Sequence, residues 1–276
     1  MKPLLGLGLA LLALAGCKTA PEVKPASAPP ELASQELTIA EQGLTEFTVR
    51  LEGQVKSADA ARVEKATYEL VVDGKVVDQG EARLDQDVPA AGAASFKLEK
   101  TSKYVGSPEE LKAISARGGS LLVALRGKAT VSRAGQPMTV LEFAKSREVR
   151  VPRLPHVKMH ELDAARYGAD EASATFFLGV DNPNPFPVKL LGLDYKVLIG
   201  GKQMADGTRG SGEKVAASST GVFEVQVPVN KETFGPEVAK LIKTLTLPYV
   251  VTGAIRGDLL DEPYELKGDI KLNQSK

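Results

Sequence analysis

The sequence contains very few of the residues on which most protein chemistry depends. Its 276 residues include one cysteine, at position 17, two histidines and no tryptophan. A single cysteine excludes a disulfide framework and a metal site built from several thiolates. The absence of tryptophan and an aromatic content of only 5% argue against a site that binds sugars or bases by stacking.

Neither sign of charge is in excess, because 35 basic residues balance 35 acidic ones. Proteins that bind nucleic acid carry a basic patch or stripe, and the sequence shows no run of this kind. We therefore expect no nucleic-acid partner.

The first 17 residues have the organisation of an exported lipoprotein signal. Lys2 precedes an apolar run over residues 4–15, which is too short to span a bilayer and fits the core of a signal peptide. The ending Leu-Ala-Gly-Cys at residues 14–17 resembles a bacterial lipobox. That resemblance implies a signal peptide over residues 1–16 and a diacylglycerol group on the sulfur of Cys17. The alternative is an ordinary secretory signal followed by an unmodified cysteine.

The residues after Cys17 indicate where the chain is held. Residue 18 is Lys, whereas an Asp there resembles an inner-membrane retention signal in bacteria with two membranes. In such a cell we expect attachment to the outer membrane, facing the periplasm, with the membrane as a partner through the lipid anchor. Residues 17–34 are rich in Pro and Ala, and this composition predicts a semi-extended tether that reaches up to roughly 50 Å.

An internal repeat organises the rest of the chain. "TYELVVDGKVVDQG" at residues 67–80 matches "DYKVLIGGKQMADG" at residues 194–207, which pairs Tyr68 with Tyr195. "LRG" at residues 125–127 also matches "IRG" at residues 255–257. We therefore predict two copies of one module, over residues 35–152 and 153–276.

The pattern within each copy is that of a β-sandwich. Apolar residues alternate with polar ones, as in Phe47, Val49 and Leu51, which indicates half-buried strands. The pairs at residues 73–74 and 200–201 are hairpin turn signals. One helix is expected in each copy, over residues 107–119 and from Pro236 onward. The predicted fold is mainly β, with two tandem β-sandwiches of about seven strands and one short helix each.

Three prolines at alternate positions interrupt the second copy in "NPNPFPV", residues 182–188. Proline donates no backbone hydrogen bond, so it suits strand edges and junctions. Asparagine side chains can bond to nearby backbone groups and stabilise a turn. We interpret the stretch as a rigid crossing between two strands.

The same stretch resembles the type-2 late-embryogenesis-abundant family, the water-stress and hypersensitive-response (WHy) domain. The residues that carry the resemblance, and that we interpret as structural, are Asn182, Pro183, Asn184, Pro185, Pro187, Tyr195, Gly201 and Gly207. The first copy has no Asn-Pro-Asn at the aligned position. The resemblance implies a fibronectin-III-like or immunoglobulin-like sandwich, no catalytic residues, no cofactor and a stress-associated, protective role.

Few other residues suggest chemistry. His156 and His160, with Glu161 or Asp163 nearby, could ligate a metal; the alternative is that they flank apolar residues on the first strand of the second copy. Several acidic residues lie in predicted loops, where exposure to solvent explains their presence without a catalytic role: Asp85, Asp87, Asp258, Asp261 and Glu262. "RGD" at residues 256–258 is an adhesion-like tripeptide that we interpret as a strand end.

These observations favour a non-enzymatic, lipid-anchored protein of the cell envelope that binds or protects other molecules under desiccation or osmotic stress. The alternative is a structural or adaptor lipoprotein that joins other envelope proteins in a complex. A hydrolase is a third possibility, but no nucleophile motif supports it.

Overall fold

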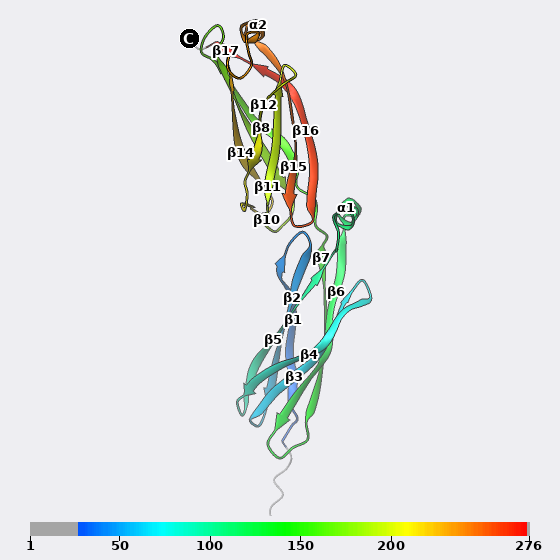
Figure 1. Ribbon diagram of the computed structural model, residues 1–276. Coiled ribbons are helices and arrows are strands. Elements are labelled where there is room, and N and C mark those ends of the chain that lie inside the picture. The colour runs from blue at the N-terminus through cyan, green and yellow to red at the C-terminus, as the bar shows by residue number, and fades with distance from the viewer. Residues whose placement is uncertain (1–26, 275–276) are drawn as a thin grey trace, which may run out of the picture.

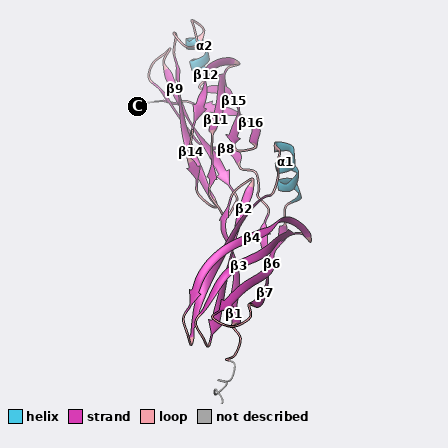
Figure 2. Cartoon of the chain, turned by 60° about the horizontal axis from the view of Figure 1, so that its bottom comes forward, coloured by secondary structure: helices cyan, strands magenta, loops and turns pink. Residues whose placement is uncertain are grey.

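The computed structural model describes residues 27–274, which form two β-sandwiches that follow one another along the molecule (Figure 1). Nearly all of the regular structure is strand (Figure 2). The prediction of a mainly β chain with tandem sandwiches is therefore confirmed. Within residues 27–274, neither helix has the length and apolar character needed to cross a membrane.

The first sandwich contains seven strands and one helix, with these bounds: β1 (Glu31–Gln42), β2 (Glu46–Ser57), β3 (Ala61–Val72), β4 (Lys75–Val88), β5 (Gly92–Lys103), α1 (Pro108–Arg117), β6 (Ser120–Arg133) and β7 (Thr139–Arg150). One sheet has the strand order β1-β2-β5 and the other β4-β3-β6-β7. All neighbouring strands are antiparallel.

The second sandwich contains seven long strands, three short ones and a helix: β8 (His156–Arg166), β9 (Ala172–Asn182), β10 (Val188–Lys189), β11 (Gly192–Ile199), β12 (Lys202–Arg209), β13 (Lys214–Val215), β14 (Ser219–Val229), α2 (Val238–Lys243), β15 (Thr246–Gly257), β16 (Leu260–Lys271) and β17 (Asn273–Gln274). Its main sheets have the orders β14-β9-β8-β17 and β12-β11-β15-β16, and β10 pairs with β13.

The repeat is visible in the strand order. β1-β2-β5 corresponds to β8-β9-β14, and β4-β3-β6-β7 corresponds to β12-β11-β15-β16. Tyr68 lies opposite Gly127, and Tyr195 lies opposite Gly253. The match of residues 125–127 with 255–257 is therefore wrong, because Gly127 is the structural equivalent of Gly253 and not of Gly257.

The first sandwich begins earlier than its composition suggests. β1 starts at Glu31, which pairs with Lys56 of β2. Residues 31–34, predicted to be tether, are therefore sheet. These residues form a strand because their backbone pairs with β2. The Pro- and Ala-rich composition does not predict this pairing.

Alternating side chains fill a separate core in each sandwich. The predicted inward-facing residues Phe47, Val49 and Leu51 are buried, and so are the alternating apolar residues of β9: Phe176, Leu178 and Val180. Each such side chain stabilises the fold by about 1.5–3 kcal/mol relative to an exposed one.

The two helices differ in how well the sequence predicts them. α1 begins after Ser107, whose Oγ accepts a hydrogen bond from the backbone N of Glu110 at 3.2 Å, and ends at Gly118 with φ 63°. These caps begin and end the helix within the predicted range of residues 107–119. α2 begins two residues after Pro236, contains six residues and buries Val238 and Ile242.

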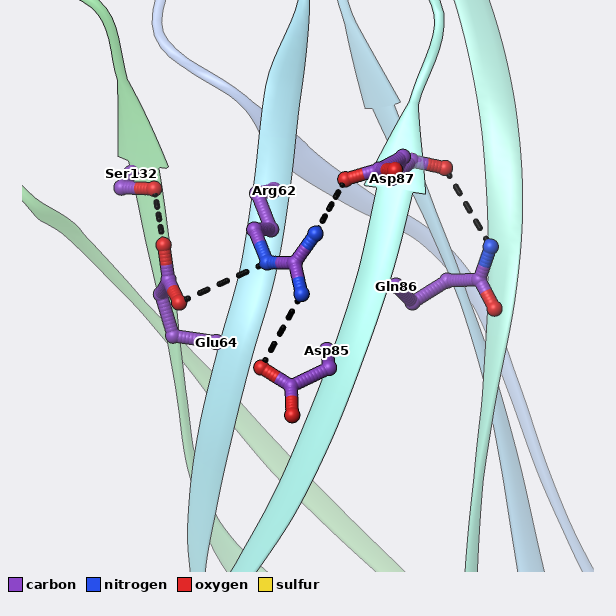
Figure 3. Close-up of polar contacts among 6 residues, drawn as sticks. All are labelled: Arg62, Glu64, Asp85, Gln86, Asp87 and Ser132. Atoms are coloured by element: carbon purple, nitrogen blue, oxygen red, sulfur yellow. Dashed lines mark hydrogen bonds and ion pairs between the residues drawn. The ribbon is translucent and has the colours of Figure 1, made fainter.

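The acidic group is mostly on strands and not in loops. Asp85 and Asp87 lie on β4, and their carboxylates face the guanidinium of Arg62 on β3 at 3.2 and 2.8 Å (Figure 3). Arg62 is also 3.7 Å from Glu64, whose carboxylate accepts a hydrogen bond from Ser132 at 2.5 Å. The charges pair across the surface of the sheet, where such ion pairs contribute little to stability. Asp261 and Glu262 lie on β16, and only Asp258 lies in a turn.

Gly253→Ala is expected to destabilise the second sandwich by about 2 kcal/mol, as overpacking of a closely packed site does. An added Cβ at Gly253 would lie 1.8 Å from the carbonyl oxygen of Asp194 and 2.9 Å from Oη of Tyr264. Guanidinium unfolding followed by circular dichroism measures the loss. Gly168→Ala is the matched control, because the nearest atoms to its new Cβ are 4.0 Å away. Equal stability of the two variants would contradict the close approach at Gly253.

Candidate functional site

The proline stretch lies where the second sandwich meets the first, and its side chains alternate between solvent and core. Pro183, Pro185 and Pro187 are exposed. The residues between and beside them are buried: Asn182, Asn184, Phe186 and Val188. Because every second residue of an extended chain faces the same side, the prolines occupy the outer positions and the asparagines the inner ones.

Asn182 holds the crossing from inside. Its Nδ2 donates to the carbonyl oxygens of Phe186 at 2.8 Å and Ala216 at 3.0 Å, with that of Val215 at 3.3 Å. Its Oδ1 accepts from the backbone N of Asn184 at 3.0 Å. The side chain is only 2% exposed, and all of its hydrogen-bonding capacity is used.

Asn184 extends this network to the connection between the sandwiches. Its Nδ2 donates to the carbonyl oxygen of Arg153 at 2.8 Å, and its Oδ1 accepts from the backbone N of Arg153 at 2.7 Å. The Nδ2 also donates to Oδ1 of Asn182 at 2.9 Å. Asn184 therefore binds both the N–H and the carbonyl group of one residue in the connection, residues 151–155, as the backbone of a neighbouring strand would.

Helix α1 of the first sandwich also reaches across the junction. The backbone N of Leu154 donates to Ser115 Oγ at 2.8 Å, and the ammonium of Lys112 is 3.6 Å from the carboxylate of Glu262. Leu111, only 1% exposed, packs into the hydrophobic core of the second sandwich. The junction is thus held by a buried apolar contact as well as by hydrogen bonds.

The turn after β15 adds a further bond. Thr45 Oγ1, in the turn between β1 and β2, donates to Oδ2 of Asp258 at 3.1 Å. The neighbouring Arg256 pairs with Asp194 at 2.9 Å and Asp261 at 3.0 Å. Hydrogen bonds from Thr208 and then from Arg256 lower the pKa of Asp194. The charged groups of the adhesion-like tripeptide are therefore engaged within the protein.

An open cleft of about 910 Å³ lies beside these contacts, between the end of β1, the end of β7 and the proline stretch. Its charged lining residues are mixed in sign: Glu41, Glu46, Glu148, Asp258, Arg147, Arg150, Lys189 and Lys214. The described residues that line it include no histidine or cysteine. The arrangement can contact a polar surface, but it offers no activated nucleophile of the kind described for covalent catalysis.

A half-buried polar side chain, Gln42, forms two hydrogen bonds beside this cleft. Gln42 Nε2 donates to the hydroxyl oxygen of Tyr104 at 2.7 Å and to the carbonyl oxygen of Arg150 at 2.7 Å. Burial raises the pKa of Tyr104, so its phenol stays protonated at physiological pH. Tyr104 also packs its ring 4.9 Å from that of Phe47.

The two histidines lie on β8 and are both exposed. His156 Nε2 is 3.4 Å from a carboxylate oxygen of Asp181, and His160 occupies an irregular position where the β8–β9 register shifts. Asp181 also accepts hydrogen bonds from Lys158 and Thr220, which lower its pKa in that order of effect. Within residues 27–274, no three His, Cys, Asp or Glu side chains gather closely enough to hold a metal ion.

Three motif residues of the second sandwich have structural positions. Gly207 leaves room for the ring of Tyr195, since an added Cβ would lie 2.9 Å from the tyrosine oxygen. Gly201 has φ 82° in the turn between β11 and β12, a conformation that favours glycine. The predicted lipidation site Cys17, the predicted signal peptide and the predicted tether up to residue 26 lie outside the described residues.

Comparison with known proteins identifies one family. Residues 177–273 match the model of the family described as late embryogenesis abundant protein, which supports membership of the second sandwich in that family. The match begins within β9, so it covers most of the second sandwich and none of the first. A search of curated proteins finds no match to the chain.

Solved structures give only distant matches. A protein from Archaeoglobus fulgidus is 17% identical with a TM-score of 0.35, over 45% of this chain and all of that one. Red sea bream transglutaminase is 13% identical, with a TM-score of 0.30, and Bacteroides uniformis beta-glucuronidase is 13% identical, with a TM-score of 0.31. Those two alignments cover 88% of this chain but only 31% and 32% of the matched chains. At these scores the matches carry no functional inference.

Proposed function

We propose that this chain is a non-enzymatic, lipid-anchored protein of the cell envelope, of the type-2 late-embryogenesis-abundant kind, which protects proteins or membrane surfaces during desiccation or osmotic stress. The observation that carries the proposal is the buried network of Asn182 and Asn184. These residues are the most distinctive part of the family resemblance, and all their polar contacts are made within the protein. The motif therefore supports a structural role and not a chemical one.

The direction of β1 supports a function at a distance from the anchor. Gln42, at the end of β1, lines the cleft at the junction, so Glu31 lies at the opposite end of the first sandwich. At about 3.3 Å per residue, a strand of this length spans on the order of 40 Å. An anchor at Cys17 would thus leave the second sandwich as the part of the protein farthest from the membrane.

Cys17→Ala tests the anchor. We expect the variant to move from the membrane fraction to the soluble fraction, because it loses the acyl chains that hold it, each buried methylene of which contributes about 0.8 kcal/mol. Fractionation with a high-salt wash, followed by immunoblotting, measures the shift. A Lys18→Ala variant is the control, since it keeps the thiol. Retention of Cys17→Ala in washed membranes would exclude the lipid as the anchor.

Protection is tested separately with purified protein. A client enzyme such as lactate dehydrogenase is dried and rehydrated with the protein or with an equal mass of serum albumin. We expect less light scattering and more recovered activity with the protein than with albumin. Equal aggregation in both samples would count against protection while leaving the anchor untouched.

A second candidate function is that of an adaptor within an envelope complex. The junction favours it, because Asn184, Ser115 and Leu111 join the two sandwiches into one unit of defined length. Pull-down of the lipidated protein from detergent-solubilised envelopes, read by mass spectrometry, separates the two functions. One partner at near-equal amounts supports the adaptor, and a diffuse set of weak clients supports protection.

A further inference from the structure

We infer that the first sandwich carries a docking groove for a short segment of a partner protein that combines apolar and acidic side chains. The groove has a volume of about 530 Å³ and lies between α1 and the turn that joins β3 to β4. Its apolar lining comes from both sides: Val72, Val77, Tyr104, Ala113, Ile114 and Leu121. The inference concerns a site on the first sandwich and does not depend on the proposed protective role.

The second sandwich shows what fills the equivalent space. The turn between β11 and β12 corresponds to the turn between β3 and β4, and a Cβ at Gly200 would lie 3.2 Å from Leu241 and 3.5 Å from Phe234. Lys202 Nζ donates to the carbonyl oxygen of Phe234 at 2.5 Å and lies 5.5 Å from the centre of its ring. A phenylalanine and a leucine thus cover this turn in the second sandwich.

The first sandwich has a connection of the same length but uses it elsewhere. Residues 104–119 join β5 to β6, and residues 230–245 join β14 to β15. In the first sandwich, α1 lies near the end of the second sandwich (Figure 1), and its Leu111 and Ser115 form contacts at the junction. Because α1 packs toward β16, its own β3–β4 turn is left without the cover that Phe234 and Leu241 provide in the second copy.

The charges on the rim define the partner further. Three cations line the groove and form no ion pair with any residue between 27 and 274: Lys75, Lys103 and Arg117. Two carboxylates also line the groove, and each accepts a backbone hydrogen bond, Asp73 from Leu122 at 2.8 Å and Glu110 from Gly106 at 2.6 Å. Three cations against two anions leave the rim with a net positive charge. The rim therefore complements an acidic segment.

The occupant follows from these two observations. It presents a phenylalanine and a leucine, spaced as in residues 230–245, to the apolar lining, and carboxylates to Lys75 and Arg117. Val77, which lines the groove and is 49% exposed, loses contact with water when it binds. Burial of such exposed apolar side chains is what a docking surface uses for affinity.

The test uses a labelled synthetic peptide of residues 230–245 in which Lys240→Glu and Lys243→Glu make the segment acidic. We expect saturable binding to the full chain by fluorescence anisotropy. A peptide that also carries Phe234→Ala and Leu241→Ala is expected to bind at least tenfold more weakly. Absence of saturable binding by the first peptide overturns the proposal.

Variants of the protein locate the binding. Ala113 lines the groove and Ala116 does not, although both are exposed on α1. We expect Ala113→Trp to weaken binding at least tenfold and Ala116→Trp to leave it unchanged, with circular dichroism showing that both fold. Equal effects of the two variants overturn the location. Self-association of the full chain that Ala113→Trp removes and Ala116→Trp keeps would make a second copy the occupant, and would overturn the partner proposed.

Charge reversal completes the test. A variant carrying Lys75→Glu and Arg117→Glu is expected to bind the acidic peptide at least tenfold more weakly than the parent protein does. The same variant is expected to bind the unsubstituted 230–245 peptide more tightly than the parent protein does. A loss of affinity for both peptides alike would overturn the assignment of an acidic partner.

Discussion

Asn182→Ala is expected to lower the free energy of unfolding of the second sandwich by about 4 kcal/mol. The substitution leaves the carbonyl group of Phe186 and the backbone N–H of Asn184 without their side-chain partner in a buried region. The carbonyl group of Ala216 loses one bond but still accepts a hydrogen bond from Ser219 Oγ. Each unsatisfied buried group costs about 1–3 kcal/mol. The side chain is 2% exposed, so water has little access to replace the lost bonds. Guanidinium unfolding followed by circular dichroism measures the effect.

Two controls separate this network from the proline stretch around it. Pro185→Ala changes an exposed neighbour and is expected to alter stability by less than about 1 kcal/mol, since it acts mainly through the unfolded chain. Asn182→Asp keeps the acceptor for Asn184 but cannot donate to the carbonyl groups, so it should be destabilising as well. A loss below about 1 kcal/mol for Asn182→Ala would mean that the network is dispensable.

This network also explains why the motif is readable from sequence. The alternation of proline with asparagine and apolar residues over 182–188 places two opposite faces on an extended chain, and the structure shows Pro183 and Pro185 outside and Asn184 inside. The period of a strand fixes which residues share a face. The strand period does not predict which backbone groups the asparagines bind, because the groups of Arg153 and Ala216 lie in distant parts of the chain.

The sandwiches themselves were predictable for the same reason. Alternation predicts the buried faces of β2 and β9, and the tyrosine and glycine pairs mark equivalent positions in the two copies, as Tyr68 with Gly80 and Tyr195 with Gly207 show. Local sequence patterns gave wrong predictions where the structure of a segment depends on the strand that pairs with it. Residues 31–34 are strand because β2 lies beside them, and the "LRG" and "IRG" triplets fall at different places on β6 and β15.

The position of α1 is the feature that sequence reasoning missed. Its capping residues specify a helix, and the structure confirms it. The sequence of the helix does not predict that Leu111 packs in the core of the other sandwich. An apolar stripe indicates that one face of a helix is buried, but it does not indicate which element buries it. For the same reason the groove could not be predicted, because it forms where α1 leaves the turn between β3 and β4 uncovered.

Leu111→Ala is expected to cost about 3 kcal/mol, within the range of about 2–5 kcal/mol for removing a buried leucine side chain, and to uncouple the two sandwiches. Leu111 is the apolar side chain of α1 that enters the core of the second sandwich. Without it, the junction retains Leu44 and Val105, which belong to the same core cluster, and the hydrogen bonds of Thr45, Ser115 and Asn184. The loss of the buried leucine of α1 therefore weakens the coupling between the sandwiches. In calorimetry we expect the parent protein to unfold in a more cooperative transition than the variant, whose sandwiches melt separately.

The control is Leu121→Ala, which removes a buried leucine from the core of the first sandwich only. It should destabilise that sandwich by a similar amount and leave the coupling in place. Small-angle X-ray scattering provides a second measurement, because a wider distribution of angles between the sandwiches is expected for Leu111→Ala and not for Leu121→Ala. Identical calorimetric and scattering behaviour of the two variants would show that the other junction contacts, including Leu44 and Val105, hold the sandwiches together without Leu111. A separation confined to Leu111→Ala would show that the buried contact of α1 sets the spacing on which an adaptor function depends.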